Sequence, residues 1–137
     1  MIINKLKHHR DKRGYFYELW KGEPKLKIKQ ANISFSKKGV VRGIHFEPWD
    51  KYIHVIKGKI LAVIVDLDGS YKKYILDSRQ ALFIPKGKGN SFQALEDTIY
   101  CYLTTGVWQN KKYKTMSYKQ IKWPLKPIVS EKDAKNS

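Results

Sequence analysis

Residues 30–51 read QANISFSKKGVVRGIHFEPWDK, and this stretch holds most of the signals for the fold and the chemistry of the chain. Polar and apolar side chains alternate at its start. On an extended strand, this alternation places one row of side chains on each face. The polar row is Gln30, Asn32 and Ser34, and the apolar row is Ala31, Ile33 and Phe35. The pattern predicts a strand with one hydrogen-bonding face and one apolar face.

The run VVRGIHF at 40–46 carries an arginine and a histidine three residues apart. Strict alternation would place Arg42 and His45 on opposite faces of a strand. Gly43 lies between them, and a β-bulge at this glycine would bring both side chains to one side. Taken alone, the polar row of residues 30, 32 and 34 would most often be a hydrated strand face, and a single histidine on a strand usually has a structural role. Together they favour a pocket that contains a cation and an imidazole.

The whole arrangement resembles the dTDP-4-dehydrorhamnose 3,5-epimerase family of the cupin superfamily. Members have Gln-x-Asn-x-Ser, followed eight residues later by Arg-Gly-Leu-His. The matching residues here are Gln30, Asn32, Ser34, Arg42, Gly43 and His45, with Ile44 in place of the leucine. The resemblance implies an antiparallel jelly-roll barrel of the cupin type. It also implies an isomerase of deoxysugar and cell-surface polysaccharide biosynthesis that acts on a dTDP-linked 4-keto-6-deoxyhexose.

The same resemblance implies the roles of three catalytic residues. His45 would abstract the proton at C3, Lys51 would stabilise the enolate oxygen, and Tyr102 would return a proton from the other face. A surface lysine and a half-buried core tyrosine are the alternatives for the last two. The implied substrate-binding residues in this part of the chain are Gln30, Asn32, Ser34, Arg42, Asn90 and Trp108, with Gln30 and Arg42 at the diphosphate.

The segment DKRGYFYE at 11–18 reads by itself as a tight turn that leads into a half-buried strand. In the epimerases, a similar segment reaches across a dimer and holds the base and diphosphate of the nucleotide. Arg13, Phe16 and Glu18 match those positions, which implies a phosphate clamp, a stacking platform and an acceptor for the base edge. The resemblance therefore predicts a homodimer in which segment 11–18 is shared between subunits.

No metal or other cofactor is expected. The second cupin motif is Pro-x-Gly-x-x-His, whose histidine commonly binds a metal, but this chain ends its version of the motif with Asn90. The remaining candidate ligands are His45, Glu47 and His54, which are few and irregularly spaced. We therefore predict a barrel without a catalytic metal.

Two departures from the family bear on the reaction. Epimerases usually have Ala-His-Gly-Phe where this chain has GNSF at 89–92, and a second tyrosine where it has Trp108. Asn90 can form a hydrogen bond with a sugar but cannot titrate, and an indole cannot replace a phenol in proton transfer. These changes favour epimerisation at C3 alone over the double reaction at C3 and C5.

The carboxylate partner of His45 is a third departure. The resemblance continues at IKWP, residues 121–124, and at SEKD, residues 130–133, but the family's Trp-x-Asp-Pro, expected to orient the histidine, has no counterpart at 115–118. A histidine without its carboxylate is less basic and less firmly oriented. Either Glu47, Asp50 or another acid replaces this partner, or the chemistry is slower or different.

The residue pattern of the rest of the chain is typical of a β protein. Nine short runs rich in Tyr, Phe, Ile and Val are separated by turn residues, and no stretch of ten residues has clear helical periodicity outside weak candidates near the C-terminus. The runs lie at 14–20, 27–35, 40–46, 52–58, 59–67, 71–76, 80–85, 91–95 and 98–105. They predict one all-β domain over residues 1–137, an antiparallel sandwich or barrel, with a polar tail from about residue 130 that frays.

Charge and cysteine usage limit the other classes. The net charge is +16, yet 24 of the 28 basic residues are lysines scattered over nearly every segment. Nucleic-acid readers usually concentrate charge and rely on arginine, so a nucleic-acid partner is disfavoured. No apolar run is long enough to span a bilayer, and Met1–Lys5 has charges where a signal sequence would be apolar. The lone Cys101 fits a reducing compartment, so we expect a cytoplasmic protein.

Three alternatives stay open from the sequence. A sugar-nucleotide 3,4-ketoisomerase would use a related barrel, but it more usually has Arg-Gly-x-His-Ala-His, whereas Phe46 and Glu47 follow His45 here. A non-catalytic binding module would keep affinity for dTDP without exchanging sugar protons. A basic nucleic-acid binder would bind in a salt-sensitive way that survives loss of His45 or Tyr102.

Overall fold

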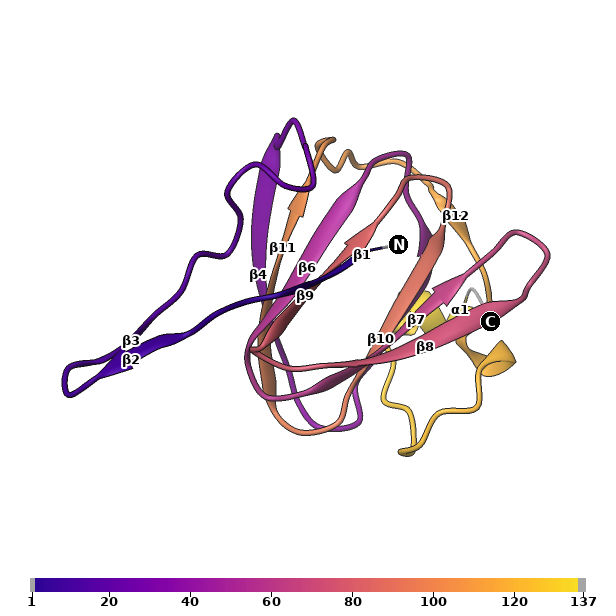
Figure 1. Cartoon of the computed structure of the whole chain (residues 1–137). Coiled ribbons are helices and arrows are strands. Elements are labelled where there is room, and N and C mark those ends of the chain that lie inside the picture. Colours follow the sequence, from indigo (N-terminus) through magenta and orange to yellow (C-terminus); the bar gives the residue numbers. More distant parts are fainter. Residues whose placement is uncertain (1, 136–137) are drawn as a thin grey trace.

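The structure is a computed structural model that describes residues 2–135, and it consists mainly of two antiparallel five-stranded sheets (Figure 1). The first sheet has the order β1 (Ile2–Lys5), β9 (Gln80–Ile84), β6 (Lys51–Lys57), β11 (Thr98–Thr104) and β4 (Gln30–Ser36). The second has the order β12 (Lys114–Thr115), β5 (Val41–Phe46), β10 (Gly89–Ala94), β7 (Ile60–Val65) and β8 (Tyr71–Leu76). A separate hairpin of β2 (His9–Asp11) and β3 (Gly14–Phe16) projects from the body.

The strand order is that of a jelly roll. From β4 to β11, each strand lies in the other sheet from the one before it, except that β7 and β8 share the second sheet. The resulting orders are β4-β11-β6-β9 and β5-β10-β7-β8. Two such interlocked sets of four antiparallel strands define this fold. The expectation of an all-β antiparallel jelly roll with little helix is confirmed.

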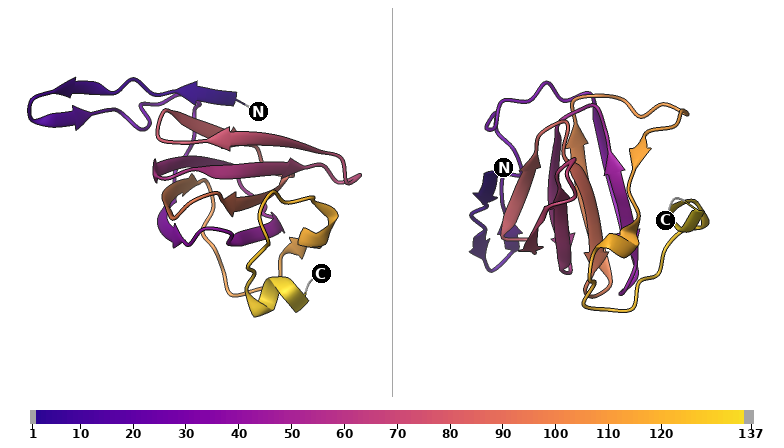
Figure 2. Two further views of the ribbon diagram at one scale, coloured as in Figure 1. Left: turned by 90° about the horizontal axis from the view of Figure 1, so that it is seen from below. Right: turned by 90° about the vertical axis from the view of Figure 1, so that its right-hand side faces the viewer.

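The core is built by period-2 alternation along the buried strands. Every residue of β7 is buried, because this strand has apolar contacts on both faces. Ile60, Ala62 and Ile64 pack into the cluster between the sheets with residues such as Ile53 and Leu82. The intervening residues of β7 pack instead with Ile44, Phe46 and Ile121, and Met116 and Trp123 of the C-terminal segment lie against that second cluster. The C-terminal segment thus covers the outer face of the second sheet (Figure 2).

Eight of the nine predicted strands are present with small shifts of their ends. The exception is the first, because only Gly14–Phe16 of the run 14–20 is a strand. The pattern did not reveal β1, β2 or β12, which are short or rich in polar residues.

The expectation of a frayed tail is wrong for the residues up to Lys135, while residues 136 and 137 lie outside the described part. After a 3₁₀ turn, η1 (Tyr118–Gln120), the chain ends in helix α1 (Glu131–Lys135). The Ser130 hydroxyl accepts a hydrogen bond from the backbone N–H of Asp133 at 3.1 Å, which caps the first turn. The helix packs on β5 and buries Asp133.

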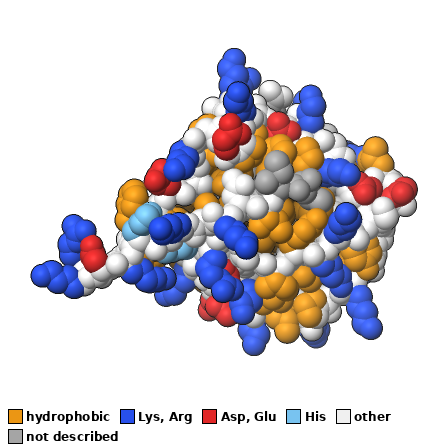
Figure 3. Space-filling view, in the orientation of Figure 1, with side chains coloured by type: hydrophobic (Ala, Val, Ile, Leu, Met, Phe, Trp, Pro, Cys, Tyr) orange, Lys and Arg blue, Asp and Glu red, His pale blue; other side chains and the backbone are white. Residues whose placement is uncertain are grey.

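Lysine and arginine side chains are spread over the face shown in Figure 3 instead of forming one block. None of the helices among residues 2–135 is both long enough and apolar enough to cross a membrane.

Candidate active site

A β-bulge in β5 brings Arg42 and His45 to the same cavity. Pairing with β10 shifts register there, since Asn90 lies opposite His45 and Phe92 opposite Arg42, so β5 has one extra residue. Gly43 has a φ of +110°, and a Cβ at this position would lie 2.6 Å from the Asn90 carbonyl oxygen. Only glycine fits such a conformation at such a distance. The predicted bulge is confirmed.

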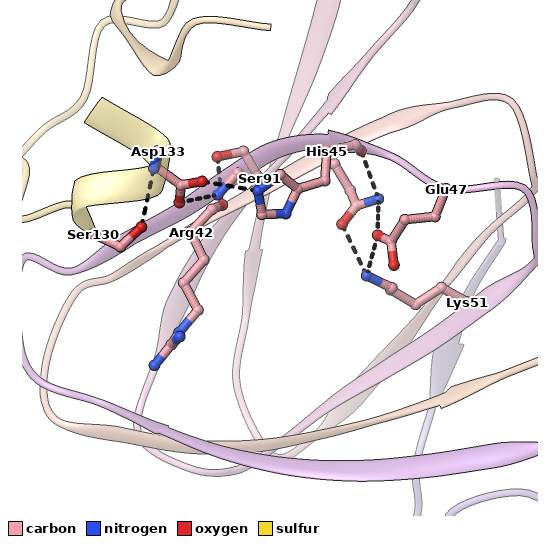
Figure 4. A network of polar contacts seen from close by, with 9 residues as sticks. Arg42, His45, Glu47, Lys51, Ser91, Ser130 and Asp133 are labelled. Atoms are coloured by element: carbon pink, nitrogen blue, oxygen red, sulfur yellow. Dashed lines mark hydrogen bonds and ion pairs between the residues drawn. The ribbon is translucent and has the colours of Figure 1, made fainter. Parts of the chain in front are cut away.

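His45 forms a hydrogen bond with Asp133 of helix α1 (Figure 4). The His45 Nε2 atom lies 2.9 Å from Asp133 Oδ1, and the Gly43 N–H donates to Asp133 Oδ2 at 3.2 Å. An ionised carboxylate can only accept, so Nε2 carries the hydrogen in this contact. The other ring nitrogen, Nδ1, has no hydrogen-bond partner among residues 2–135 and keeps its lone pair for a proton.

Asp133 is held in its ionised form although its side chain is 9% exposed. Burial by itself raises the pKa of this carboxyl group, but the hydrogen bond and charge of His45 and the N–H of Gly43 lower the pKa below its ordinary value. The carboxylate therefore orients the imidazole and stabilises it when it becomes charged.

The identity of this partner decides among the alternatives that the sequence left open. Of the three options, Glu47 binds Lys51, and Asp50 accepts a hydrogen bond from the Lys86 backbone N–H at 2.9 Å. The partner is another acid, Asp133, which lies 88 residues away from His45 in the chain and beside it in the fold. The histidine does not lack its carboxylate.

Lys51 lies on β6 of the first sheet and is buried in a small polar network that reaches across to the second sheet (Figure 4). Its Nζ donates to Glu47 Oε1 at 2.7 Å and to Asn90 Oδ1 at 3.1 Å. The Asn90 amide nitrogen donates to the His45 carbonyl oxygen at 3.2 Å and lies 3.4 Å from Glu47 Oε1. Lys51 is thus not one more surface lysine.

Tyr102 lies on β11, next to Lys51 of β6 in the first sheet and across the cavity from His45 and Asn90 of the second sheet. The Lys51 Nζ lies 4.8 Å from the centre of the Tyr102 ring. Burial, followed by the charges of Tyr100 and Glu47, raises the pKa of Tyr102 above its ordinary value. A phenol that keeps its proton in this way can serve as an acid.

One open cavity of about 1260 Å³ connects these groups. His45, Lys51 and Tyr102 all line it, so the three residues expected to be catalytic come together. The predicted binding residues that also line it are Ser34, Arg42, Asn90 and Trp108.

A smaller adjoining cavity of about 320 Å³ holds the rest of the polar row of β4. Gln30 and Asn32 line it together with Trp49. Gln30 accepts a hydrogen bond from the Trp108 backbone N–H at 2.9 Å. Glu47, Tyr102 and Trp108 line both cavities, so the two are neighbours.

The remaining predicted residues do not reach either cavity within one chain. Arg13, Phe16 and Glu18 are exposed, and Arg13 binds the carboxylate of Asp11 on its own hairpin. Their assignment to the nucleotide stays a prediction that requires a second chain. In residues 2–135, no group of three or more His, Cys, Asp or Glu side chains is arranged to hold a metal ion.

Two polar residues of the site were missed. Asp133 carried a usable signal, because Ser130-x-x-Asp133 is the spacing of a helix cap and would have predicted an ordered turn at this acid. Glu47 was considered only as a metal ligand or a partner of His45. Its spacing of four residues from Lys51 does not predict their ion pair, because a loop and not a helix joins the two residues.

The sequence profile described as dTDP-4-dehydrorhamnose 3,5-epimerase matches residues 1–137. The chain is 37% identical to the "Protein RmlC homolog" of Streptococcus pyogenes serotype M6, over 79% of this chain and 66% of that protein. It is 35% identical to the dTDP-4-dehydrorhamnose 3-epimerase of Streptomyces niveus, over 82% of this chain and 62% of that protein. The chain thus spans a little under two thirds of the length of these relatives.

Solved structures agree in fold over most of the chain. The dTDP-4-dehydrorhamnose 3,5-epimerase from Sulfolobus tokodaii has a TM-score of 0.90 and 38% identity, and the match covers 96% of this chain and 86% of that one. A structure of RmlC from Streptococcus suis in complex with dTDP-D-xylose has a TM-score of 0.84 and 36% identity, with 96% and 81% covered.

Proposed function

The chain belongs to the dTDP-4-dehydrorhamnose 3,5-epimerase family, and we propose that it epimerises a dTDP-linked 4-keto-6-deoxyhexose by removing and returning the proton at C3. The observation that carries this proposal is the meeting of an Asp133-oriented imidazole, a buried ammonium and a protonated phenol in one cavity.

The steps follow from the geometry. The His45 Nδ1 lone pair takes the C3 proton, and the electrons of the C–H bond move to the C4 oxygen. The Lys51 ammonium stabilises that developing negative charge. The Tyr102 hydroxyl then donates its proton to C3 from the other face, and the C4 ketone re-forms. Exchange with solvent restores the protonation of both residues.

We infer a single epimerisation at C3. The chain has Asn90 and Trp108 where the family usually has a histidine and a second tyrosine, and neither replacement can transfer a proton. Trp108 is half exposed at the junction of the two cavities. The 3-epimerase from Streptomyces niveus is among the relatives of this chain, which supports the same reading.

We propose that the enzyme is a homodimer, because one chain leaves an apolar strand face and a binding hairpin unused. The polar row of β4 faces the cavities, so its apolar row points outward, with Ile33 74% exposed and Phe35 53% exposed. The β2–β3 hairpin extends away from the body and exposes Phe16 to 64% (Figure 1). A second copy would cover these surfaces and receive Arg13, Phe16 and Glu18 at its nucleotide.

The deciding experiment is incubation with dTDP-4-keto-6-deoxyglucose in D₂O, with NMR detection of label at C3 and C5. Label at C3 alone is expected. Label at both carbons contradicts the single epimerisation, and label at neither, with dTDP still bound, indicates a binding module.

The dimer is tested by complementation between two impaired chains at a substrate concentration well below the raised Kd of Arg13→Ala. Arg13→Ala and His45→Ala affect different halves of the proposed shared site, so mixed dimers should exchange faster than either variant does alone. Ile33→Glu should shift the sedimentation coefficient toward that of a monomer. A monomeric wild-type protein with full activity contradicts the shared site.

A further inference from the structure

The loop between β5 and β6 places a carboxylate inside the cavity that the proposed reaction does not use. The Glu47 side chain is 14% exposed and the Lys51 side chain 8% exposed, and the two form an ion pair at 2.7 Å. Two charges are expensive to remove from water, and their pairing offsets this only when the geometry is good and other hydrogen bonds are satisfied. Such a pair at the reaction centre calls for a specific explanation.

The donors of Lys51 can be counted. An ammonium group has three N–H donors. Glu47 Oε1 and Asn90 Oδ1 accept from two different directions, so one donor remains for a substrate oxygen. The rings of Tyr102 and Phe92, at 4.8 and 6.0 Å from Nζ, flank the same group. A flexible four-carbon side chain is in this way held in one position.

Asn90 completes the arrangement from the neighbouring strand. Its amide group bonds Lys51, Glu47 and the His45 backbone, and the residue is 4% exposed. An amide neither gains nor loses a proton near neutral pH. The carboxylate of Glu47 is therefore the charged group that fixes the ammonium.

We propose that Glu47 is a positioning residue: its carboxylate, together with the Asn90 amide, directs the remaining N–H of Lys51 to the C4 oxygen of the substrate. This inference rests on the proposed function for the identity of that oxygen. Glu47 itself touches no reacting atom, so its contribution belongs to the chemical step more than to binding.

Glu47 also affects the proton donor of the reaction. Other ionisable groups line the same cavity, while β10 presents only Asn90 and Phe92. They are Arg42 and His45 on β5, Tyr100 and Tyr102 on β11, Lys111, Lys112 and Tyr113 before β12, and Glu131, Lys132, Asp133 and Lys135 on α1. The charge of Glu47 is one of the causes that raise the pKa of Tyr102, after burial and Tyr100. Loss of this charge favours ionisation of the phenol and should move the alkaline limb of the pH–rate profile to lower pH.

The test compares Glu47→Gln, Glu47→Ala and the matched control Glu96→Gln, which removes an exposed carboxylate outside both cavities. Glu47→Ala should lower kcat for exchange by about 10²-fold, the scale of one lost electrostatic donor, with KM and the Kd for dTDP near wild type. Glu47→Gln keeps an acceptor for Lys51, so kcat should fall less, while the alkaline limb should still move to lower pH. The control Glu96→Gln should match the wild type both in kcat and in the position of the alkaline limb.

A second measurement does not depend on turnover. The ¹H–¹⁵N signal of the Lys51 ammonium, assigned by its loss in Lys51→Arg, should be protected from solvent exchange in the wild-type protein and in Glu96→Gln but not in Glu47→Ala. If the wild-type protein exchanges no sugar proton, the proposed function is contradicted. The Lys51 signal would even then show whether Glu47 holds the ammonium in place.

Two results would overturn the inference. One is a Glu47→Ala enzyme with wild-type kcat and an unshifted pH profile. The other is equal loss of dTDP affinity and kcat in Glu47→Gln with a lowered melting temperature, which indicates a purely structural ion pair.

Discussion

The cavity between the sheets and the β2–β3 hairpin carry the two halves of the proposed site, and they differ in how one chain supports them. His45, Lys51 and Asp133 are held by strands, a helix and hydrogen bonds of the same chain. Arg13 and Phe16 are exposed on a hairpin whose strands pair only with each other. In the proposed enzyme, proton transfer is thus organised within one subunit, whereas recognition of the nucleotide needs a second subunit.

This difference has a physical reason. Proton transfer requires side chains fixed to within a fraction of an ångström, which buried strands and satisfied polar networks provide. Recognition of a base and diphosphate depends on stacking and charge, which a projecting hairpin can offer once a partner covers it. Changes in the cavity should therefore affect turnover, and changes in the hairpin should affect affinity.

The largest effect is expected for the proton-transfer pair. His45→Asn and Tyr102→Phe each remove a positioned base or acid, so deuterium exchange at C3 should fall by about 10²- to 10⁴-fold. The Kd for dTDP, measured by calorimetry, should change little. Tyr71→Phe, on the outer strand β8, is the matched control and should exchange at the wild-type rate.

Asp133→Asn should act through His45. An amide in place of the carboxylate no longer enforces the tautomer with hydrogen on Nε2, so kcat should fall by about 10²-fold or more at unchanged dTDP affinity. Asp68→Asn, in an exposed turn, serves as the control. A fully active Asp133→Asn enzyme would show that the carboxylate only fastens the C-terminal helix.

Changes in the hairpin should separate binding from chemistry. Arg13→Ala removes a charge-assisted contact worth about 1.5–3 kcal/mol, so the Kd for dTDP should rise by about tenfold or more. Saturating substrate should restore most of kcat. Arg10→Ala, on the same hairpin, packs over Tyr15 and should bind dTDP normally. Equal effects of both substitutions would contradict a specific phosphate contact.

The smallest effect concerns the anchor of the hairpin segment on the body. His54 Nδ1–H donates to the Gln80 carbonyl oxygen at 2.8 Å, and Nε2 accepts from the Tyr17 hydroxyl at 2.6 Å. Burial lowers the pKa of His54 below its ordinary value of about 6.5. The unfolded chain therefore takes up this proton at a higher pH than the folded chain does.

Folding stability should consequently be complete above about pH 6.5 and fall as the pH decreases toward the folded-state pKa, by at most about 1.4 kcal/mol per pH unit. Urea titrations between pH 7.5 and 5 would measure the slope. His54→Gln should flatten this slope, whereas His9→Gln, at an exposed position, should not. Equal slopes in all three proteins would exclude His54 as the cause.

Alternation and turn residues predicted eight strands of a sandwich or barrel and a bulge at Gly43. The resemblance carried by the Gln30 to His45 motif implied the jelly roll and the three residues that line one cavity. They could not reveal the partner of His45, because Asp133 lies 88 residues away and is buried only when a short capped helix packs on β5. The short polar strands β1, β2 and β12 also escaped, since their pairing depends on neighbours and not on their own composition.

The sequence alone determined the two rows of β4, because the period of a strand separates polar from apolar side chains whatever surrounds it. Only the tertiary structure decided which row faces inward. Because the two sheets enclose a polar cavity beside β4, Ser34 faces that cavity and Ile33 faces outward, the reverse of what hydrophobic burial in one isolated chain would favour. Whether a side chain is buried depends on all the groups that surround it in the folded protein, and the local sequence pattern does not specify those groups.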